Sequence, residues 1–249
     1  MSGSGTAPDV RVFPDARALS AAAAAWVADE LRDSAAARSR ASLVLSGGST
    51  PRTMYELLAT QFRDRIPWPD VHAFWSDERY VPHGDPLSNY RMAKHALLDH
   101  VALPVEQVHP MPTHFADPDA AARDYERTVT GFFSGVPPIF DVALLGIGAD
   151  GHTASVFPGS PALTSPRIAL AVTAPAEPPS RLTLTLPIIA RARRIGVLVA
   201  GAGKTAALAE ALSGRNPALP AAALARTAAS LVWWVDRDAW PAGARGDTW

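Results

Sequence analysis

The chain of 249 residues contains no cysteine. This absence excludes a disulfide framework and any metal site built on thiolate ligands. It also leaves no sign of an oxidising compartment, and we expect the protein to reside in the cytoplasm. The chain is nevertheless long enough to bury a hydrophobic core without a covalent cross-link.

The sequence also has no excess of positive or negative charge and no long hydrophobic run. The 23 Lys and Arg residues against 24 Asp and Glu residues give a net charge of -1. A protein that binds nucleic acid usually has an overall positive field, so only a local basic pocket remains open. The alanine run 21–25 is soon interrupted by Asp29 and Glu30, far short of the ~20 apolar residues of a membrane span. The N-terminus, MSGSGTAPDV, has no basic segment leading into an apolar one, which argues against a signal peptide. We expect neither a nucleic-acid nor a membrane partner.

Seven short apolar runs, rich in β-branched residues, predict the strands of a sheet. They occupy residues 41–48, 71–78, 140–148, 167–174, 181–186, 194–203 and 230–236. Most are apolar throughout, as is typical of strands buried on both faces of a parallel sheet. Helix candidates lie between or beside them at residues 15–34, 51–62, 88–99, 117–133 and 204–213. The sequence therefore predicts a Rossmann-like, doubly wound α/β fold with a mostly parallel sheet and helices on both faces.

One segment departs from this pattern. Residues 181–186, RLTLTL, alternate between polar and apolar side chains, which predicts a strand exposed on one face or a small antiparallel annex. Six prolines between positions 158 and 179 mark an irregular stretch just before it. We interpret the chain, residues 1–249, as a single domain with a small insertion around 157–186.

Polar or glycine-rich loops follow four of the predicted strands. They lie at residues 46–50, 76–79, 146–152 and 201–204. In an open parallel sheet, ligands bind beyond the carboxyl ends of the strands. We therefore expect the four loops to converge on one cleft.

The first loop combines two glycines with two hydroxyl side chains at a predicted helix start. Its residues are Gly47, Gly48, Ser49 and Thr50. Unpaired backbone N–H groups at such a position suit a phosphate. The alternative is an ordinary Ser/Thr helix cap with proline in the first turn.

The last loop, GAGKT, presents Lys204 near a helix start. It is not a Walker A loop, because that motif needs a glycine where Leu198 stands. Lys204 is predicted to contact a phosphate as a point charge. A solvated surface lysine is the alternative.

The third loop, GIGADGHTAS, matches the glycine spacing of a dinucleotide fingerprint. That fingerprint runs into a long helix and meets an acidic residue about 20 positions later. Here Pro158 ends any helix early, and the first acidic residue after Asp150 is Glu177. The glycines instead predict a tight turn that delivers His152 to the cleft. Asp150 either orients the imidazole or stabilises the turn.

The second loop contains two adjacent carboxylates followed by an arginine, Asp77, Glu78 and Arg79. A single Asp-Glu pair without further ligands is weak evidence for a metal, so we predict no metal site. Asp77 and Arg79 are predicted to line the cleft, with Arg79 facing an anionic ligand. Asn89 follows at a helix start and is either a cleft contact or part of that start.

These loops taken together resemble the 6-phosphogluconolactonases of the glucosamine-6-phosphate isomerase and deaminase superfamily. The resemblance covers nearly the whole chain, in the family's order. It rests on LVLSGGSTP, FWSDERYVPHGDPLSNYRMA, DVALLGIGADGHTASVFPGSPAL, RLTLTLPII and VLVAGAGKTAAL. Deaminases of the superfamily have a loop like DGHIAFNEP, whereas this chain reads DGHTASVFP. The missing Asn-Glu pair favours a lactonase.

The resemblance implies hydrolysis of 6-phospho-D-glucono-1,5-lactone to 6-phosphogluconate, in the oxidative pentose phosphate pathway, without cofactor or metal. His152 would take a proton from the attacking water and return one to the ring oxygen, a task that suits an imidazole. The amides of Gly47 and Gly48 would stabilise the oxyanion. The phosphate candidates are Ser49, Thr50, Arg79, Arg181 and Lys204. Which of the three cations contacts the phosphate stays open.

Two other functions remain as alternatives. A glucosamine-6-phosphate deaminase or isomerase would use the same phosphate contacts and an acid-base carboxylate such as Asp77. A non-catalytic sugar-phosphate sensor would carry a DNA-binding helix-turn-helix, for which there is no room before the first predicted strand. The sequence leaves the oligomeric state open and is compatible with a monomer.

Overall fold

The computed structural model describes residues 8–241 and 247–248. Residues 1–7, which form most of the segment used to argue against a signal peptide, lie outside the described residues. No helix within the described ranges is both long enough and apolar enough to cross a membrane.

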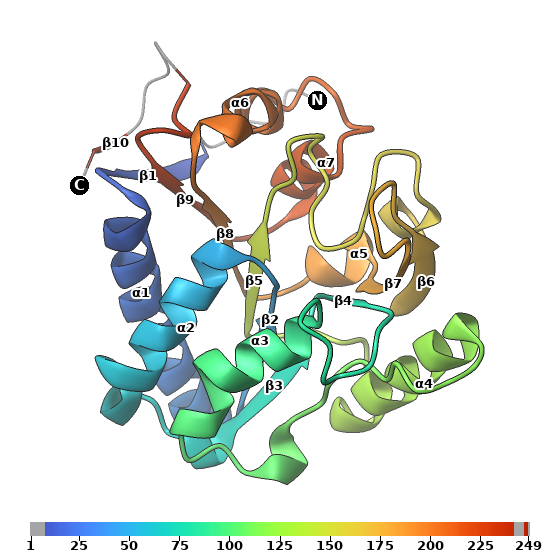
Figure 1. Cartoon of the computed structure of the whole chain (residues 1–249). Helices are drawn as coiled ribbons and strands as arrows, with labels where there is room; N and C mark the ends of the chain where they lie inside the picture. Colours follow the sequence, from blue (N-terminus) through green and yellow to red (C-terminus); the bar gives the residue numbers. More distant parts are fainter. Residues whose placement is uncertain (1–7, 242–246, 249) are drawn as a thin grey trace.

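A seven-stranded sheet forms the centre of the molecule (Figure 1). Its order is β10-β1-β9-β8-β5-β2-β3, and every pairing is parallel. The strands are β1 (Asp9–Phe13), β2 (Ala41–Leu45), β3 (Val71–Trp75), β5 (Val142–Gly146), β8 (Arg194–Val199), β9 (Leu231–Asp236) and β10 (Asp247–Thr248). All five residues of β2 are buried, as expected for a strand covered on both faces. The prediction of a mostly parallel α/β sheet is confirmed.

Helices lie on both faces of this sheet. They are α1 (Ala16–Arg38), α2 (Ser49–Thr60), α3 (Asn89–Ala96), α4 (Pro118–Phe132), α5 (Leu186–Ile189), α6 (Thr205–Ser213) and α7 (Pro220–Thr227). Short 3-10 helices occur at Arg63–Arg65, Trp68–Asp70, Leu98–His100, Val105–Gln107, Pro161–Leu163 and Ala202–Lys204. Figure 1 shows α1 on one side of the sheet and α5 and α7 on the other. Helix α1 packs closely: a Cβ at Gly196 of β8 would lie 2.8 Å from the Trp26 ring.

Several element boundaries differ from those predicted. Helix α1 continues to Arg38, and Ser39 closes it with a left-handed φ of 58°. The helix predicted at 88–99 ends as α3 at Ala96. Elements β1, β10, α5 and α7 were not predicted.

A second, three-stranded antiparallel sheet lies beside the first. Its order is β4-β7-β6, from β4 (Asp77–Arg79), β7 (Ser180–Leu184) and β6 (Ala169–Thr173). The alternation in residues 181–186 correctly predicted an antiparallel annex. The apolar run at 167–174 was wrongly grouped with the parallel strands. It forms β6, an edge strand, and its apolar character comes from packing against α4 rather than from the main sheet.

The run predicted as one strand at 71–78 is two strands in different sheets. Strand β3 ends at Trp75, and Ser76 carries the chain from the main sheet into β4. The Ser76 amide donates to the Leu45 carbonyl of β2, while its own carbonyl accepts from the Leu184 amide of β7. Ser76 therefore connects the two sheets.

The strand order reverses between β2 and β5. The chain passes from β2 to β3 in one direction, whereas β5, β8 and β9 follow in the other. A crevice at the carboxyl ends of strands is the usual ligand site at such a switch point. The loops at 46–50 and 146–152 stand on its two sides.

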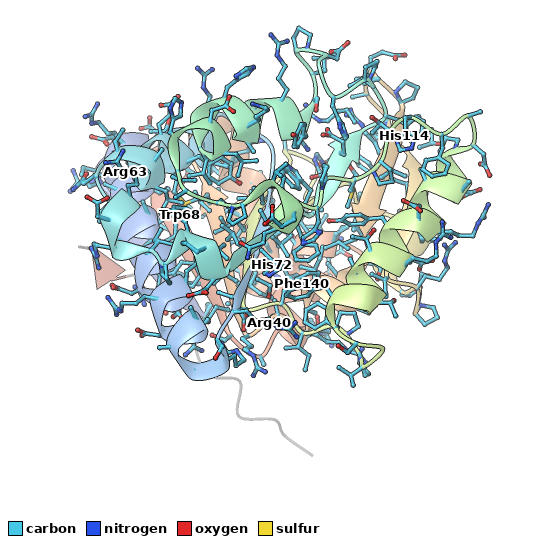
Figure 2. All side chains as sticks on the ribbon, turned by 90° about the horizontal axis from the view of Figure 1, so that it is seen from below. Arg40, Arg63, Trp68, His72, His114 and Phe140 are labelled. Carbon is cyan, nitrogen blue, oxygen red and sulfur yellow. The ribbon has the colours of Figure 1, made fainter. Side chains whose placement is uncertain are left out.

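The opposite, amino-terminal end of the strands is closed by aromatic and cationic side chains. Figure 2, seen from below, shows Arg40, His72 and Phe140 close together. His72 Nδ1 lies 3.1 Å from His109 Nε2. The Arg40 guanidinium lies 4.4 Å from the centre of the Phe132 ring. This cluster is a packing feature at the end of the sheet away from the predicted cleft.

Candidate active site

Residues from all four predicted loops line one cleft of about 330 Å³ at the carboxyl ends of the strands. The structure brings together eight of the ten predicted site residues. They are Gly47, Gly48, Ser49, Thr50, Asp77, Arg79, His152 and Lys204. The other two lie behind this lining. Asp150 contacts His152, and Arg181 lies opposite Arg79 in the small sheet. The roles of the ten residues remain predictions.

Helix α2 opens onto the cleft without a side-chain cap. Its N-cap residue is Gly48, with a φ of 110°, and no side chain bonds to the first turn. Ser49 and Thr50 are already inside the helix. The alternative of an ordinary Ser/Thr cap is therefore wrong. The amides of the first turn have no helical partners of their own, so an anion can satisfy them.

Lys204 lines the same cleft from the loop that follows β8. It ends the 3-10 helix Ala202–Lys204, just before α6. The turn before it depends on Gly201, whose φ is 90°. The Gly201 amide lies 3.0 Å from both carboxylate oxygens of Asp236, at the end of β9. A buried carboxylate thus fixes the loop that carries the lysine.

The imidazole of His152 is oriented by Asp150. His152 Nδ1 lies 2.5 Å from Asp150 Oδ1, and the His152 amide lies 3.2 Å from the same oxygen. Burial acts to raise the pKa of Asp150, but the hydrogen bonds from His152 outweigh it and lower that pKa. With Nδ1 occupied by the carboxylate, Nε2 is the nitrogen left for chemistry in the cleft. This arrangement suits a general base.

A glycine makes room for this pair. A Cβ at Gly148 would lie 2.1 Å from His152 Nδ1 and 2.5 Å from Asp150 Oδ1. The Gly148 amide also donates to the His152 carbonyl, at 2.8 Å. Gly148, one of the glycines that match the spacing of a dinucleotide fingerprint, therefore allows close packing of the His-Asp pair.

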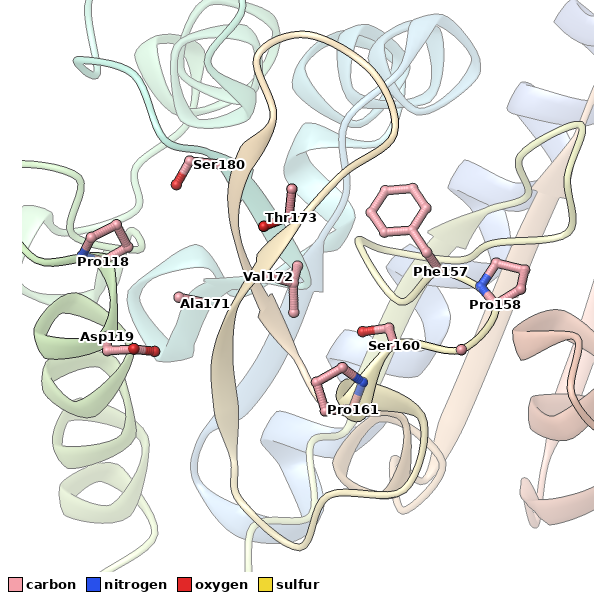
Figure 3. Close-up of a pocket in the computed structure, with 11 residues that line it drawn as sticks. Pro118, Asp119, Phe157, Pro158, Ser160, Pro161, Ala171, Val172, Thr173 and Ser180 are labelled. Carbon is pink, nitrogen blue, oxygen red and sulfur yellow. The ribbon is translucent and has the colours of Figure 1, made fainter.

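Phe157 supports the imidazole. The two rings lie with centres 4.7 Å apart. Beyond Phe157 is a second hollow of about 600 Å³, which also contacts β6 and the start of α4. Figure 3 shows Phe157, Ser160 and Pro161 facing Val172 and Thr173 of β6 across this hollow. No sequence motif had indicated this role of Phe157.

Asp77 is a buried carboxylate held by neutral donors. Ser155 Oγ donates to Oδ2 at 2.7 Å, and Ser76 Oγ donates to Oδ1 at 3.1 Å. The Asn89 side-chain amide donates to the Asp77 carbonyl at 2.9 Å. Asn89 lines the cleft as well, and a Cβ at Gly47 would lie 2.0 Å from its Oδ1. Both interpretations of Asn89 hold, because this residue begins α3 and also lines the cleft.

Glu78, unlike Asp77, bonds to the start of α3. Its carboxylate accepts from the backbone amides of Asn89, Tyr90 and Arg79 and from Ser88 Oγ, at 2.7–2.9 Å. Burial raises the pKa of Glu78 in spite of these donors. The side chain therefore holds the start of α3. Within the described ranges, no group of three or more His, Cys, Asp or Glu side chains is placed to hold a metal.

Arg79 and Arg181 lie opposite each other in the antiparallel pair β4 and β7. Arg79 lines the cleft, whereas Arg181 is only 7% exposed. Its Nε and Nη1 atoms have no hydrogen-bond partner among the described residues. Burial lowers the pKa of Arg181, and the charge of Arg79 lowers it further against the opposing effect of Asp77.

Comparisons with known proteins identify the family of the chain. A family profile described as "Glucosamine-6-phosphate isomerases/6-phosphogluconolactonase" matches residues 14–233. The chain belongs to this family. The resemblance of the sequence blocks is thereby confirmed.

Individual members of the family match over nearly their whole length. A 6-phosphogluconolactonase of Synechocystis is 42% identical, over 94% of this chain and 97% of its own. One of Mycobacterium tuberculosis is 43% identical, over 92% of this chain and 96% of its own. The crystal structure of 6-phosphogluconolactonase from Leishmania guyanensis is 29% identical, with a TM-score of 0.84 over 96% of this chain and 100% of that one.

Proposed function

We propose that this protein hydrolyses 6-phospho-D-glucono-1,5-lactone to 6-phospho-D-gluconate, a step of the oxidative pentose phosphate pathway, in the cytoplasm. The observation that carries the proposal is that His152, oriented by Asp150, lines one cleft with the uncapped start of α2 and with Lys204. The printed names of the two relatives and of the Leishmania structure support it.

The phosphate of the substrate belongs at the start of α2. The free amides of the first turn and the positive end of the helix dipole favour a dianion there. Ser49 and Thr50 add hydroxyl donors, and Lys204 adds a positive charge from the loop after β8. Charge-assisted hydrogen bonds of this kind are roughly twice as strong as neutral ones.

The reaction at C1 then needs a positioned base more than a nucleophilic side chain, because a lactone carbonyl is already electrophilic. Neutral His152 removes a proton through Nε2 from a water whose oxygen bonds to C1. The carbonyl oxygen takes the negative charge, next to the amides of Gly47 and Gly48. The C1–O5 bond then breaks, and the imidazolium returns the proton to O5. General acid-base help of this kind contributes about 10²- to 10⁴-fold.

Asp77 is proposed to orient the sugar. Asp77 lines the cleft. Its carboxylate accepts hydrogen bonds from the hydroxyls of Ser155 and Ser76 and from the Asn89 side-chain amide, all of them neutral donors. Such a carboxylate retains acceptor capacity for the hydroxyl groups of the substrate. This contact would position C1 below His152.

The deciding assay is acid release from freshly generated 6-phosphogluconolactone, corrected for spontaneous ring opening. We expect the purified protein to accelerate this release. A parallel incubation with glucosamine 6-phosphate measures ammonia. Robust ammonia release without lactonase activity would identify a deaminase instead, and binding of the sugar phosphate with no acceleration would identify a sensor.

A further inference from the structure

Two buried tyrosines hold the ends of neighbouring strands in the main sheet. The Ser46 amide, directly after β2, donates to Tyr55 Oη at 2.9 Å, and the Tyr55 hydroxyl donates to the Ser46 carbonyl at 3.0 Å. The same pair of bonds joins Tyr125 to Trp75, the last residue of β3, at 2.9 and 3.2 Å. Both tyrosines are completely buried. In each case one hydroxyl therefore satisfies both backbone groups of a buried residue.

Tyr55 bonds to the chain where β2 and β5 separate. Strand β2 pairs with β5 as far as Val44 and Ala143, and its pairing with β3 continues to Leu45. Ser46 lies beyond these pairs, and its amide and carbonyl bond to Tyr55 instead. Tyr55 thereby fixes the chain at the point where the crevice between the two strands opens.

The residue held by Tyr55 leads into the uncapped start of α2. Gly47 and Gly48 follow Ser46, and Gly48 is the N-cap residue of the helix. Tyr55 lies in the second turn of the same helix, so its hydroxyl bonds α2 to the residue that precedes the two glycines. Asn89 also limits the loop, because a Cβ at Gly47 would lie 2.0 Å from its Oδ1. The path of the loop 46–48 is therefore fixed by bonds and contacts within the protein.

We propose that Tyr55 is a positioning residue for the substrate phosphate, because its hydroxyl keeps the loop 46–48 in the path that turns the first amides of α2 to the cleft. The inference rests on the proposed function and extends it to a completely buried side chain. Donors that are ordered before an anion arrives lose little conformational freedom when they bind it. Without the hydroxyl, the amide and carbonyl of Ser46 would be buried and unpaired, and the loop would leave this path to recover partners.

Tyr125 provides a matched control for this role. Tyr55→Phe and Tyr125→Phe remove the same two hydrogen bonds from two strand ends, and both should melt about 3–8 °C below the wild type. The strand end held by Tyr125 leads into β4 rather than into a helix start. We expect calorimetric binding of 6-phosphogluconate to weaken about 10-fold in Tyr55→Phe, as for a short segment that must be ordered on binding. In Tyr125→Phe it should weaken less than about 3-fold.

The lactone assay separates positioning of the phosphate from a general loosening of the fold. The phosphate does not change during the reaction, so weaker contacts to it remove uniform binding. Tyr55→Phe should therefore raise KM about 10-fold and keep kcat within about 3-fold of the wild type. Tyr125→Phe should keep both constants within about 3-fold.

Three results with these variants would overturn the inference. Equal weakening of 6-phosphogluconate binding in the two variants would show that Tyr55 serves only the fold. Unchanged binding in Tyr55→Phe would show that the loop keeps its path without the hydroxyl. A fall in kcat at constant KM would place the effect of Tyr55 at the reacting end of the sugar.

Amide hydrogen exchange in the wild type tests the same point without a substitution. The Ser46 amide should exchange slowly in the ligand-free protein, and saturating 6-phosphogluconate should change its rate by less than about 3-fold. Rapid exchange that slows only when the ligand is added would show that the ligand orders the loop, and would overturn the inference. A wild type that binds 6-phosphogluconate but does not accelerate lactone hydrolysis would instead overturn the proposed function, and one that does not bind it would overturn both.

Discussion

His152 Nδ1 and Asp150 Oδ1 lie 2.5 Å apart on a turn that leaves no room for a side chain at Gly148. The carboxylate fixes one ring nitrogen, and Phe157 packs against the ring itself. The imidazole is therefore held in one orientation before any substrate arrives. A base that is already positioned loses little conformational freedom when the reaction begins.

Replacing the base should affect turnover more than binding. His152→Ala removes help that exists only in the transition state, so kcat should fall about 10²- to 10⁴-fold while KM stays nearly constant. His114→Ala, at an exposed position, is the control and should behave as the wild type. The measurement is acid release from fresh lactone, and an unchanged kcat would mean that another group is the base.

Gly148→Ala tests the orientation of that base without removing it. The added methyl group would lie about 2 Å from His152 Nδ1, so the ring or the turn must move. We expect kcat to fall by about 10²-fold, because small misplacements of catalytic groups have effects of that size. Gly131→Ala, where a Cβ would meet nothing within 4 Å, should leave kcat unchanged. Normal turnover in Gly148→Ala would show that the Nδ1 contact does not matter.

Lys204→Ala should act mainly on KM. The lysine is proposed to contact the phosphate, which does not change during the reaction, so its loss removes uniform binding. A charge-assisted hydrogen bond is worth about 1.5–3 kcal/mol, or roughly 10- to 100-fold in KM. Lys94→Ala removes an exposed ion pair with Asp99 instead and serves as the control. A fall in kcat at constant KM would move Lys204 to the reacting end.

The histidine pair at the opposite end of the sheet predicts an acid-sensitive fold. Burial lowers the pKa of His109 to about 4, with a further contribution from His72. Burial and the nearby Arg40 also lower the pKa of His72. Since both groups bind protons more readily when unfolded, their contribution to stability is present above about pH 6.5 and is lost as pH falls toward 4.

Urea unfolding at pH 7.5 and pH 5 measures this effect. We expect the free energy of unfolding to fall by about 1–2 kcal/mol, after allowing for solvent at the half-buried pair. His109→Phe keeps a ring against Phe74 and should reduce the fall, whereas His114→Phe should not. An equal fall in all three proteins would assign the pH dependence to other groups.

The strands could be predicted correctly where an apolar run reflects burial within the parallel sheet. Residues 41–45 are apolar because both faces of β2 are covered, and such runs identify parallel strands directly. Residues 169–173 are also mostly apolar but for another reason, packing against α4, so apolar character alone placed β6 in the wrong sheet. Strand β1 has two charged residues in five, too short and mixed a pattern to recognise.

The predicted loops converge because parallel strands end at one edge, which topology alone requires. What the sequence did not reveal were contacts across that edge. The bond between Ser155 and Asp77 joins residues 78 positions apart, and the packing of Phe157 on His152 depends on the exact path of the turn. No spacing rule encodes either contact.

The hydrogen bonds of Ser155 also connect the catalytic loop to the small sheet. The Ser155 hydroxyl donates to Asp77 and its amide donates to the Thr183 hydroxyl oxygen, so the segment with His152 is bonded to β4 and to β7 of the small sheet. Any opening between this segment and the small sheet would first have to break both bonds.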